Sequence, residues 1–210
     1  MLVDMGADVD TALKYAELRL GAIKKRAPSI VARSLNRGIS RMNTVGKKAV
    51  KDRYTIKAKK VNDSVKVWRA NKNDLRAAVR VRSERIHVVD LKVSSKKFQH
   101  KRKTKKPVTV EIIKGQVKPI YGFMAPGTGS GKPILFRRSR DKPSKRIRIP
   151  GTTSKGRRKT NSERPIEAIR GPSVPEMMNH RSIRNEMADA GKEKFSEELE
   201  REINRALGVK

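Results

Sequence analysis

Hydrophobic positions follow a helical period in the first part of the chain. Between residues 9 and 52, apolar side chains recur every three or four positions, which is typical of helices packed on one face. Asp10-Thr11 can cap a first helix, and Pro28-Ser29 interrupts it and opens a second. The two predicted apolar stripes are Leu13, Ala16, Leu20 and Ile23, then Val31, Leu35, Ile39, Met42, Val45 and Ala49.

The pattern changes to a period of two between residues 60 and 137. Residues 65–68 and 75–82 alternate apolar with polar side chains, which predicts two half-buried strands joined by a turn at 71–74. A second hairpin is predicted from residues 108–113 and 117–124, with Pro119 and Gly122 as candidate interruptions of its second strand. Residues 86–91 and 134–137 are the remaining expected strands.

A long helix is predicted over residues 180–208. Its apolar residues are spaced mostly four apart: Ile183, Met187, Phe195, Leu199, Ile203 and Leu207. Seven basic and seven acidic residues fall between Arg181 and Lys210, so this segment is electrically neutral. The fold class expected from the three patterns is α+β, with N-terminal helices, a central antiparallel sheet carrying long basic loops, and a long C-terminal helix, all in a single domain of residues 1–210.

The charge of the chain indicates that the folded protein needs a partner. The chain has 53 Lys and Arg against 21 Asp and Glu, a net charge of +32, and only 4% aromatic residues. The whole excess lies before the last helix. Such a charge repels itself, and a polyanion relieves that repulsion, with nucleic acid as the first candidate and an anionic membrane surface as the second. The basic residues of the second helix, from Arg33 to Lys51, are either a solvated face or a DNA contact.

Two dense basic segments are the candidate contact sites. Residues 96–106 read as a loop or arm, and residues 138–163 as an extended basic arm rich in Gly, Ser, Thr and Pro. Few aromatic side chains accompany them, so we expect contact with phosphates or acidic partners and no base stacking. The contact residues are Lys101, Arg102, Lys103, Lys105, Lys106, Arg137, Arg138, Arg140, Lys145, Arg146, Arg148, Lys155, Arg157, Arg158 and Lys159.

Catalytic, metal and cofactor chemistry is not expected. The chain has no cysteine, and its three histidines lie far apart without close acidic companions. Residues 125–133 resemble a phosphate-binding loop, but Pro126 replaces a required glycine and Pro133 replaces the magnesium-binding Ser or Thr. We therefore expect a turn there and no enzyme activity. No signal peptide or membrane-spanning run is apparent.

A nearly uncharged strap at residues 164–178 separates the basic arm from the last helix. Pro165, Pro172 and Pro175 fix its path, Gly171 marks a turn, and Pro175 fits the first turn of a following helix. From these residues alone, the strap is either an ordinary structured linker or a rigid contact element.

Several short motifs carry a resemblance to a known family. They are Arg53-Tyr54-Thr55-Ile56-Lys57, Gly122-Phe123-Met124-Ala125, Leu135-Phe136-Arg137-Arg138, Arg164-Pro165-Ile166 and Gly171-Pro172-Ser173-Val174-Pro175. In this order, before a final helix, the chain resembles the minor tail protein Z and related neck or tail-completion proteins of long-tailed bacteriophages. The match runs from about Arg33 to the last helix, and the segment 138–164 is longer and more basic than the family's usual link.

The resemblance implies a non-catalytic virion protein of the head–tail junction. It implies a homo-oligomeric ring of six or twelve subunits around the DNA channel, contacting the portal or connector and the tail-tube or tail-terminator proteins. The protein would lie in the host cytoplasm during assembly. The strap would then supply the subunit interface through Pro165, Ile166, Ile169, Gly171, Pro172, Val174 and Pro175.

Two other interpretations remain open at this point. One is a free protein that binds nucleic acid without reading its sequence. The other is a protein whose basic arms pair only with acidic protein neighbours.

Overall fold

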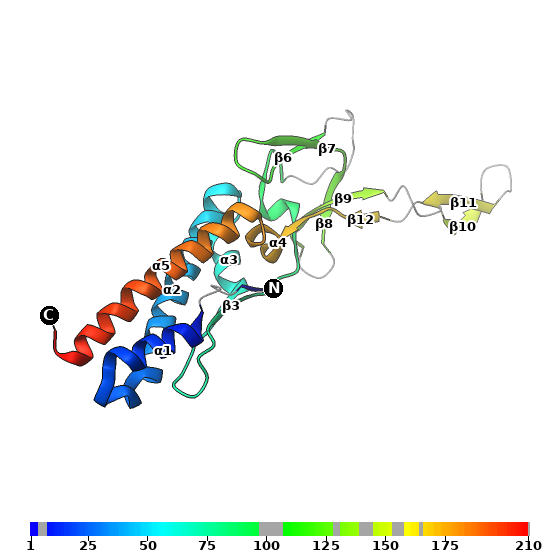
Figure 1. The fold of residues 1–210 in the computed structure, drawn as a ribbon. Helices are drawn as coiled ribbons and strands as arrows, with labels where there is room; N and C mark the ends of the chain where they lie inside the picture. The colour runs from blue at the N-terminus through cyan, green and yellow to red at the C-terminus, as the bar shows by residue number, and fades with distance from the viewer. Residues whose placement is uncertain are drawn as a thin grey trace. The chain divides into compact units, whose positions relative to one another are not determined.

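The computed structural model describes residues 1–3, 8–96, 107–127, 131–138, 145–152, 158–163 and 166–209. The chain forms two compact units (Figure 1), one made of residues 1–85 with 172–210 and the other of residues 86–171. The second unit is therefore an insertion in the chain of the first. We call them the helical unit and the inserted unit. Together they confirm the expected mixed α+β fold.

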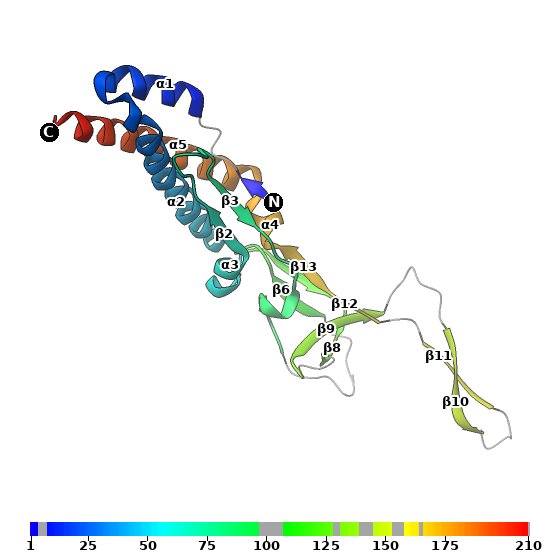
Figure 2. The same ribbon diagram turned by 90° about the horizontal axis from the view of Figure 1, so that it is seen from below.

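Three helices lie side by side in the helical unit (Figures 1 and 2): α1 (Val9–Leu20), α2 (Ala27–Arg53) and α5 (Arg181–Leu207). The cap of α1 is Asp8, two residues before the expected position, and its carboxylate accepts the backbone N–H of Thr11 at 3.1 Å. A short 3-10 segment, η1 (Gly21–Arg26), then joins α1 to α2.

Helices α2 and α5 run antiparallel, as two contacts along their length show. Arg33 near the start of α2 pairs with Glu202 near the end of α5 at 2.8 Å. Further along, Gly46 lies directly against Met187. The two helices, which lie far apart in the sequence, thus bury their apolar faces against each other.

The buried face of α2 begins where the sequence predicts it and then shifts. Val31, Leu35, Ile39 and Met42 are buried as expected. After Met42 the buried positions are Gly46 and Val50, whereas Val45 and Ala49 are only half-buried. A Cβ at Gly46 would lie 2.5 Å from the sulfur of Met187, so the glycine allows the two helices to approach closely.

The buried face of α5 follows the four-residue spacing as far as Ile203. Gly191 fills the gap in the predicted stripe and is buried. Leu207 is 40% exposed, so its place in the stripe was predicted wrongly. Steps of four residues rotate a stripe by about 40° each around the helix, and the last step carries Leu207 off the packed side. The helix ends at Gly208, which adopts the left-handed conformation typical of this position.

A small antiparallel sheet completes this unit. Its strands are β1 (Leu2–Val3), β2 (Val65–Trp68) and β3 (Ala78–Val81), in the order β1-β3-β2, with the short helix α3 (Ala58–Ser64) before β2. The predicted turn between β2 and β3 is confirmed by two backbone hydrogen bonds between Asn71 and Asp74, of 2.9 and 3.2 Å. The side chain of Asn36 on α2 bonds both backbone groups of Ala70 and fixes this hairpin to the helix.

The strap ends in a short capped helix, α4 (Val174–Met178). Ser173 accepts the backbone N–H of Glu176, and the Glu176 carboxylate accepts the N–H of Ser173 at 2.9 Å. This is a complete capping box. Pro175 lies in the first turn, as the sequence predicts.

Among its described residues, the inserted unit contains two three-stranded antiparallel sheets and a separate ribbon of two strands. The chain passes into it through β4 (Arg85–His87) and the 3-10 turn η2 (Val88–Asp90), and leaves through β13 (Arg170–Ser173). One sheet has the order β5-β6-β7, with strands Lys92–Val93, Val108–Glu111 and Val117–Ile120. The other has the order β12-β9-β8, with strands Ile166–Ala168, Pro133–Arg138 and Phe123–Pro126. Their shared core contains Val88, Val89, Val108, Val110, Met124 and Leu135.

Two predictions for this unit need adjustment. The expected strand at 86–91 stops at His87, because Val88–Asp90 turns as a 3-10 helix. The expected strand at 117–124 is split into β7 and β8 at Tyr121-Gly122, so the candidate interruption at Gly122 is confirmed. Pro119 does not interrupt β7, since β7 is an edge strand where a missing N–H is tolerated.

The strand predicted after the glycine-rich segment is confirmed as β9 (Pro133–Arg138), at the position where a phosphate-binding loop would need a helix. Gly127 donates its N–H to the carbonyl of Lys132 at 2.8 Å, which closes a hairpin between β8 and β9. A strand, not a helix, follows the glycine-rich segment.

The described parts of the second basic arm form a ribbon of two strands. β10 (Lys145–Thr152) pairs antiparallel with β11 (Arg158–Glu163), and Arg148 lies opposite Thr160. The sequence predicts an extended basic arm here. Instead its two halves pair with each other, because their backbone groups satisfy each other's hydrogen bonds (Figure 2).

Candidate functional site

The end of β9 carries two of the predicted contact residues. Arg137 and Arg138 are exposed, and the guanidinium of Arg137 lies 4.0 Å from the carboxylate of Glu167 on the neighbouring strand β12. The two groups are too far apart and too exposed to solvent to form a strong ion pair. Both arginines are thus available to an anionic partner.

The other predicted contacts fall in two groups. The backbones of Lys145, Arg146 and Arg148 lie in β10, and those of Arg158 and Lys159 in β11. The rest lie outside the described residues: Lys101, Arg102, Lys103, Lys105, Lys106, Arg140, Lys155 and Arg157.

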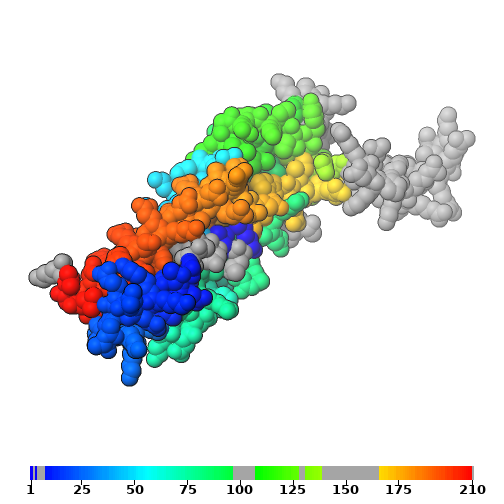
Figure 3. Space-filling model, in the orientation of Figure 1, coloured from blue at the N-terminus to red at the C-terminus, as the bar shows by residue number. Residues whose placement is uncertain are grey.

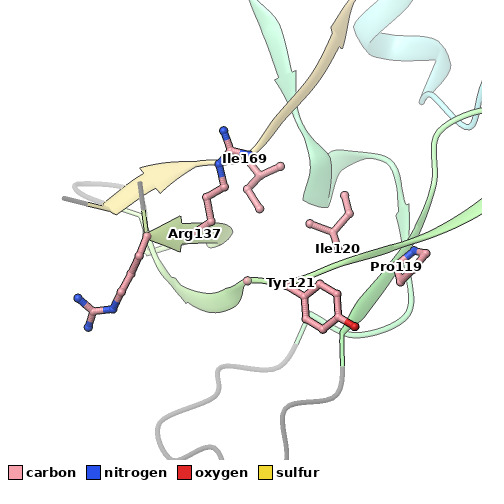
Figure 4. Close-up of a pocket in the computed structure, with 7 residues that line it drawn as sticks. Pro119, Ile120, Tyr121, Arg137 and Ile169 are labelled. Carbon is pink, nitrogen blue, oxygen red and sulfur yellow. The ribbon is translucent and has the colours of Figure 1, made fainter. Parts of the chain in front are cut away.

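A hollow of about 560 Å³ opens beside these arginines in the inserted unit. Figure 4 shows Ile120 and Ile169 in the hollow, with Tyr121 and Arg137 around it. Its lining residues are Pro119, Ile120, Tyr121, Gly122, Arg137, Arg138 and Ile169. The hollow therefore combines an apolar floor with two cations, which suits a protein side chain flanked by carboxylates.

The inserted unit also has several exposed large apolar side chains. Tyr121 is 65% exposed, Val117 60% and Ile166 54%. Gly122, next to Tyr121, is required here because a Cβ would lie 2.6 Å from the carbonyl oxygen of Phe136. Sequence reasoning missed Val117 and Tyr121, since an apolar residue on an edge strand has the same pattern whether it packs inside or stays exposed.

The strap residues differ in how far they are available to another subunit. Ile166 is exposed, whereas Ile169 packs on the core of the inserted unit and donates its N–H to the carbonyl of Leu135. Gly171 and Val174 are buried within their own units, and Pro172 and Pro175 are half-buried. Pro165 lies outside the described residues. Ile166 is thus the strap residue best placed to meet a partner.

A cationic hollow of about 520 Å³ lies in the helical unit. Arg26, Arg33 and Arg37 line it from the first half of the chain, and Arg205 from the end of α5. Glu202 is the single carboxylate in its lining, and it pairs with Arg33. Three guanidinium groups remain for an anion. The sequence signal was the basic spacing of α2, but Arg205 is brought in only by tertiary packing.

Ion pairs hold several carboxylates in their charged form. The pKa of Glu198 is lowered chiefly by the hydrogen bond from Lys194, and the pKa of Glu111 by the hydrogen bond from Lys92 at 2.6 Å. The pKa of Glu176 is lowered by the backbone N–H of Ser173 and also by Arg85. These interactions favour the charged form of each carboxylate in the folded chain.

Within the described ranges, no group of three or more His, Asp or Glu side chains is arranged to hold a metal ion. None of the described helices combines the length and apolar character needed to cross a membrane.

A family model for prophage minor tail protein Z (GPZ) matches residues 11–210. The chain belongs to this family. The resemblance seen in the sequence motifs is therefore confirmed, and the match includes both units and the basic arm. No curated protein and no solved structure matches the chain. As a member of the minor tail protein Z family, the chain is a structural component of a phage tail and so of the virion.

Proposed function

We propose that this minor tail protein acts at the head–tail junction, where copies form a ring of six or twelve subunits around the DNA channel and join the tail to the head. The family membership supports a structural role in the tail. The observation that carries the more specific proposal is the distribution of charge. Residues 86–171 hold 24 Lys and Arg against five Asp and Glu, a net charge of +19 in 86 residues.

The inserted unit would provide the contacts that need this charge. Its partners would be the genomic DNA in the channel, or acidic surfaces of the portal, connector, tail-tube or tail-terminator proteins. The fifteen predicted contact residues, which lie between Lys101 and Lys159, would meet phosphates or carboxylates without reading a sequence. Ile166, Tyr121 and the hollow beside Arg137 would add an apolar subunit or partner contact.

The proposed position is tested by removing the protein from an inducible phage. We expect lysates that lack it to contain filled heads and tails that are not joined, and electron microscopy counts them directly. Adding the purified full-length chain should restore joined particles. Joined particles at the normal frequency without the protein, or density for the protein at the distal tail end, would contradict the proposal.

The second candidate function is a free, sequence-nonspecific nucleic-acid-binding protein, which the net charge of +32 favours. It predicts tight DNA binding by a monomer, with a steep dependence on salt. Sedimentation of the purified chain, with and without DNA, separates this alternative from a ring-forming protein.

A further inference from the structure

The outer side of α2 carries a stripe of cations. Arg37, Arg41, Lys48 and Lys51 are all exposed. At 100° per residue they fall within about 80° of the helix circumference. None of them makes an ion pair with another residue in the part of the chain that the structure describes. We call these four residues the α2 stripe.

The outer side of α5 carries a stripe of opposite charge. Its members are Glu186, Asp189, Glu193, Glu197 and Glu200, all exposed and also within about 80° of the circumference. Figure 3 shows α5 as an uncovered ridge, coloured orange to red, along the face toward the viewer. We call these five residues the α5 stripe. The net charge of +32 does not predict a continuous acidic face on any helix.

Part of the α5 stripe is already bonded inside the subunit, and part is not. Glu197 accepts a hydrogen bond from Lys194 at 2.9 Å, and Glu200 accepts one from Tyr15 at 2.6 Å. Glu186, Asp189 and Glu193 have no hydrogen-bond or ion-pair partner among the described residues. The first half of the stripe is therefore open to a cationic partner.

The two stripes match in length. Arg37 to Lys51 and Glu186 to Glu200 each span fourteen residue steps, which is about 21 Å of helix. Each stripe has three-, four- or seven-residue spacing, so its charges stay on one line along the helix.

The stripes cannot neutralise each other within one subunit. Gly46 faces Met187 of α5 and lies half a turn away from the α2 stripe. On α5, Met187 and Glu202 contact α2 and lie on the other side of the helix from Glu193. The α5 stripe thus points away from α2, and so does the α2 stripe from Arg41 onward, whereas Arg37 also borders the arginine hollow that α5 helps to line.

We propose that the α5 stripe of one subunit docks on the α2 stripe of the next copy of this chain. This inference rests on the ring proposed above and names the surfaces that build it. Charge complementarity, equal length and exposure of both stripes select a second copy as the occupant. Because one subunit offers the two stripes on different sides, the contact is head-to-tail and repeats from copy to copy, unlike that of a two-fold dimer. It builds the proposed ring where the rotation between neighbouring copies closes.

A crosslinking experiment tests the contact directly. The chain has no cysteine, so thiols can be placed without background. Thr44 and Glu193 are exposed and lie at the midpoints of the two stripes, and midpoints meet whether the helices dock parallel or antiparallel. In tails assembled with the double variant Thr44→Cys/Glu193→Cys, a short bismaleimide should give a ladder of covalent oligomers. Each single variant should give monomers only.

Charge reversal provides an independent readout on the purified chain. Glu186→Lys/Asp189→Lys/Glu193→Lys and Arg41→Glu/Lys48→Glu/Lys51→Glu should each weaken self-association about tenfold or more, as expected from losing three exposed pairs. Mixing the two variants should restore association between unlike copies, because each supplies one intact face. Lys24→Glu/Lys25→Glu/Lys59→Glu is the matched control for the α2 variant, since it makes the same charge change at exposed residues outside the stripe.

The possible failures can be told apart. Absence of the ladder in assembled tails, or dimers from a single-cysteine variant, overturns the docking proposal even where microscopy places a ring at the junction. A ladder from tails in which the protein lies away from the head–tail junction would support the docking proposal and contradict the proposed position. Loss of DNA binding with normal self-association in the α2 variant would show that the α2 stripe binds nucleic acid, which also overturns the docking.

Discussion

Gly46 is the residue that allows α2 and α5 to pack closely. The side chain of Met187 occupies the space that a Cβ would need, with its sulfur, Cε and Cγ all within 2.9 Å of that position. A glycine inside a helix lowers the stability of the helix by about 1 kcal/mol relative to alanine. The close packing of α2 on Met187 offsets this loss.

Replacing this glycine tests the contact. Gly46→Val should lower the free energy of unfolding by about 1–3 kcal/mol, because the overpacked side chain must displace Met187. Urea denaturation followed by circular dichroism measures the change. Adding Met187→Ala should recover part of the loss, since valine then fills the space. Strictly additive costs of the two substitutions would show that the residues do not compete for the same volume.

Glu198 is a buried carboxylate whose stabilising effect depends on pH. Lys194 lies 3.0 Å away and Arg201 3.4 Å away, and Lys194 lowers the pKa of Glu198 below its ordinary value of 4.5. A carboxylate with a lowered pKa stabilises the fold above its unfolded pKa, and this stability is lost as the pH falls through the folded pKa.

The corresponding prediction compares Glu198→Gln with the natural chain. The variant should melt at a lower temperature at pH 7, and the difference should disappear well below pH 4.5, where both side chains are neutral. Differential scanning calorimetry across this range gives the measurement. Glu17→Gln, at an exposed position of α1, is the control and should leave the melting temperature unchanged.

At the scale of single elements, the capping box of α4 is a local interaction that stabilises the start of this helix. Ser173 and Glu176 each satisfy a backbone N–H of the other, and Arg85 lies 3.4 Å from the Glu176 carboxylate. A five-residue helix has little stability of its own, so the box and the burial of Val174, Met177 and Met178 maintain it.

Removing the cap should therefore have a measurable cost. Ser173→Ala is expected to lower the free energy of unfolding by about 1 kcal/mol, the usual effect of losing a serine cap. Ser196→Ala, at an exposed position inside α5, should be neutral or slightly stabilising. Equal stability of the two variants would mean that α4 is held by packing alone.

Local periodicity predicts elements well where each one buries a single face. The stripe of α2 from Val31 to Met42, the alternation in β2 and β3, and the Pro175 helix start are all confirmed, because they depend on neighbours in sequence. The turn at Asn71–Asp74 belongs to the same class.

Tertiary packing decides the features that the sequence did not predict. The shift of burial to Gly46 depends on Met187, which lies 141 positions later. The pairing of β12 with β9 joins a strap segment to a strand about thirty positions earlier, so no local pattern could indicate it. The arginine hollow similarly needs Arg205 beside Arg33.

At the scale of the whole molecule, the concentration of positive charge in the inserted unit distinguishes the two kinds of anionic partner. Each lysine or arginine that neutralises a phosphate of duplex DNA adds about 0.9 to the slope of log affinity against log salt. Acidic protein partners do not produce this slope with DNA.

The triple variant Arg157→Ala/Arg158→Ala/Lys159→Ala measures the difference. If these side chains meet DNA, the magnitude of the salt slope should fall by about 2.7. Fluorescence anisotropy with a duplex at several salt concentrations gives the slope. An unchanged slope together with lost subunit assembly would assign these residues to acidic neighbours instead.

The insertion of residues 86–171 has a consequence for synthesis. Helix α2 leaves the ribosome long before α5, and about 125 residues separate them. At 5–20 residues per second, the apolar face of α2 waits about 6–25 s for its partner, while the inserted unit can fold first. The inserted unit can therefore fold on the nascent chain before the helical unit is complete. A host chaperone that shields Leu35 and Ile39 during this interval would govern the yield of the protein.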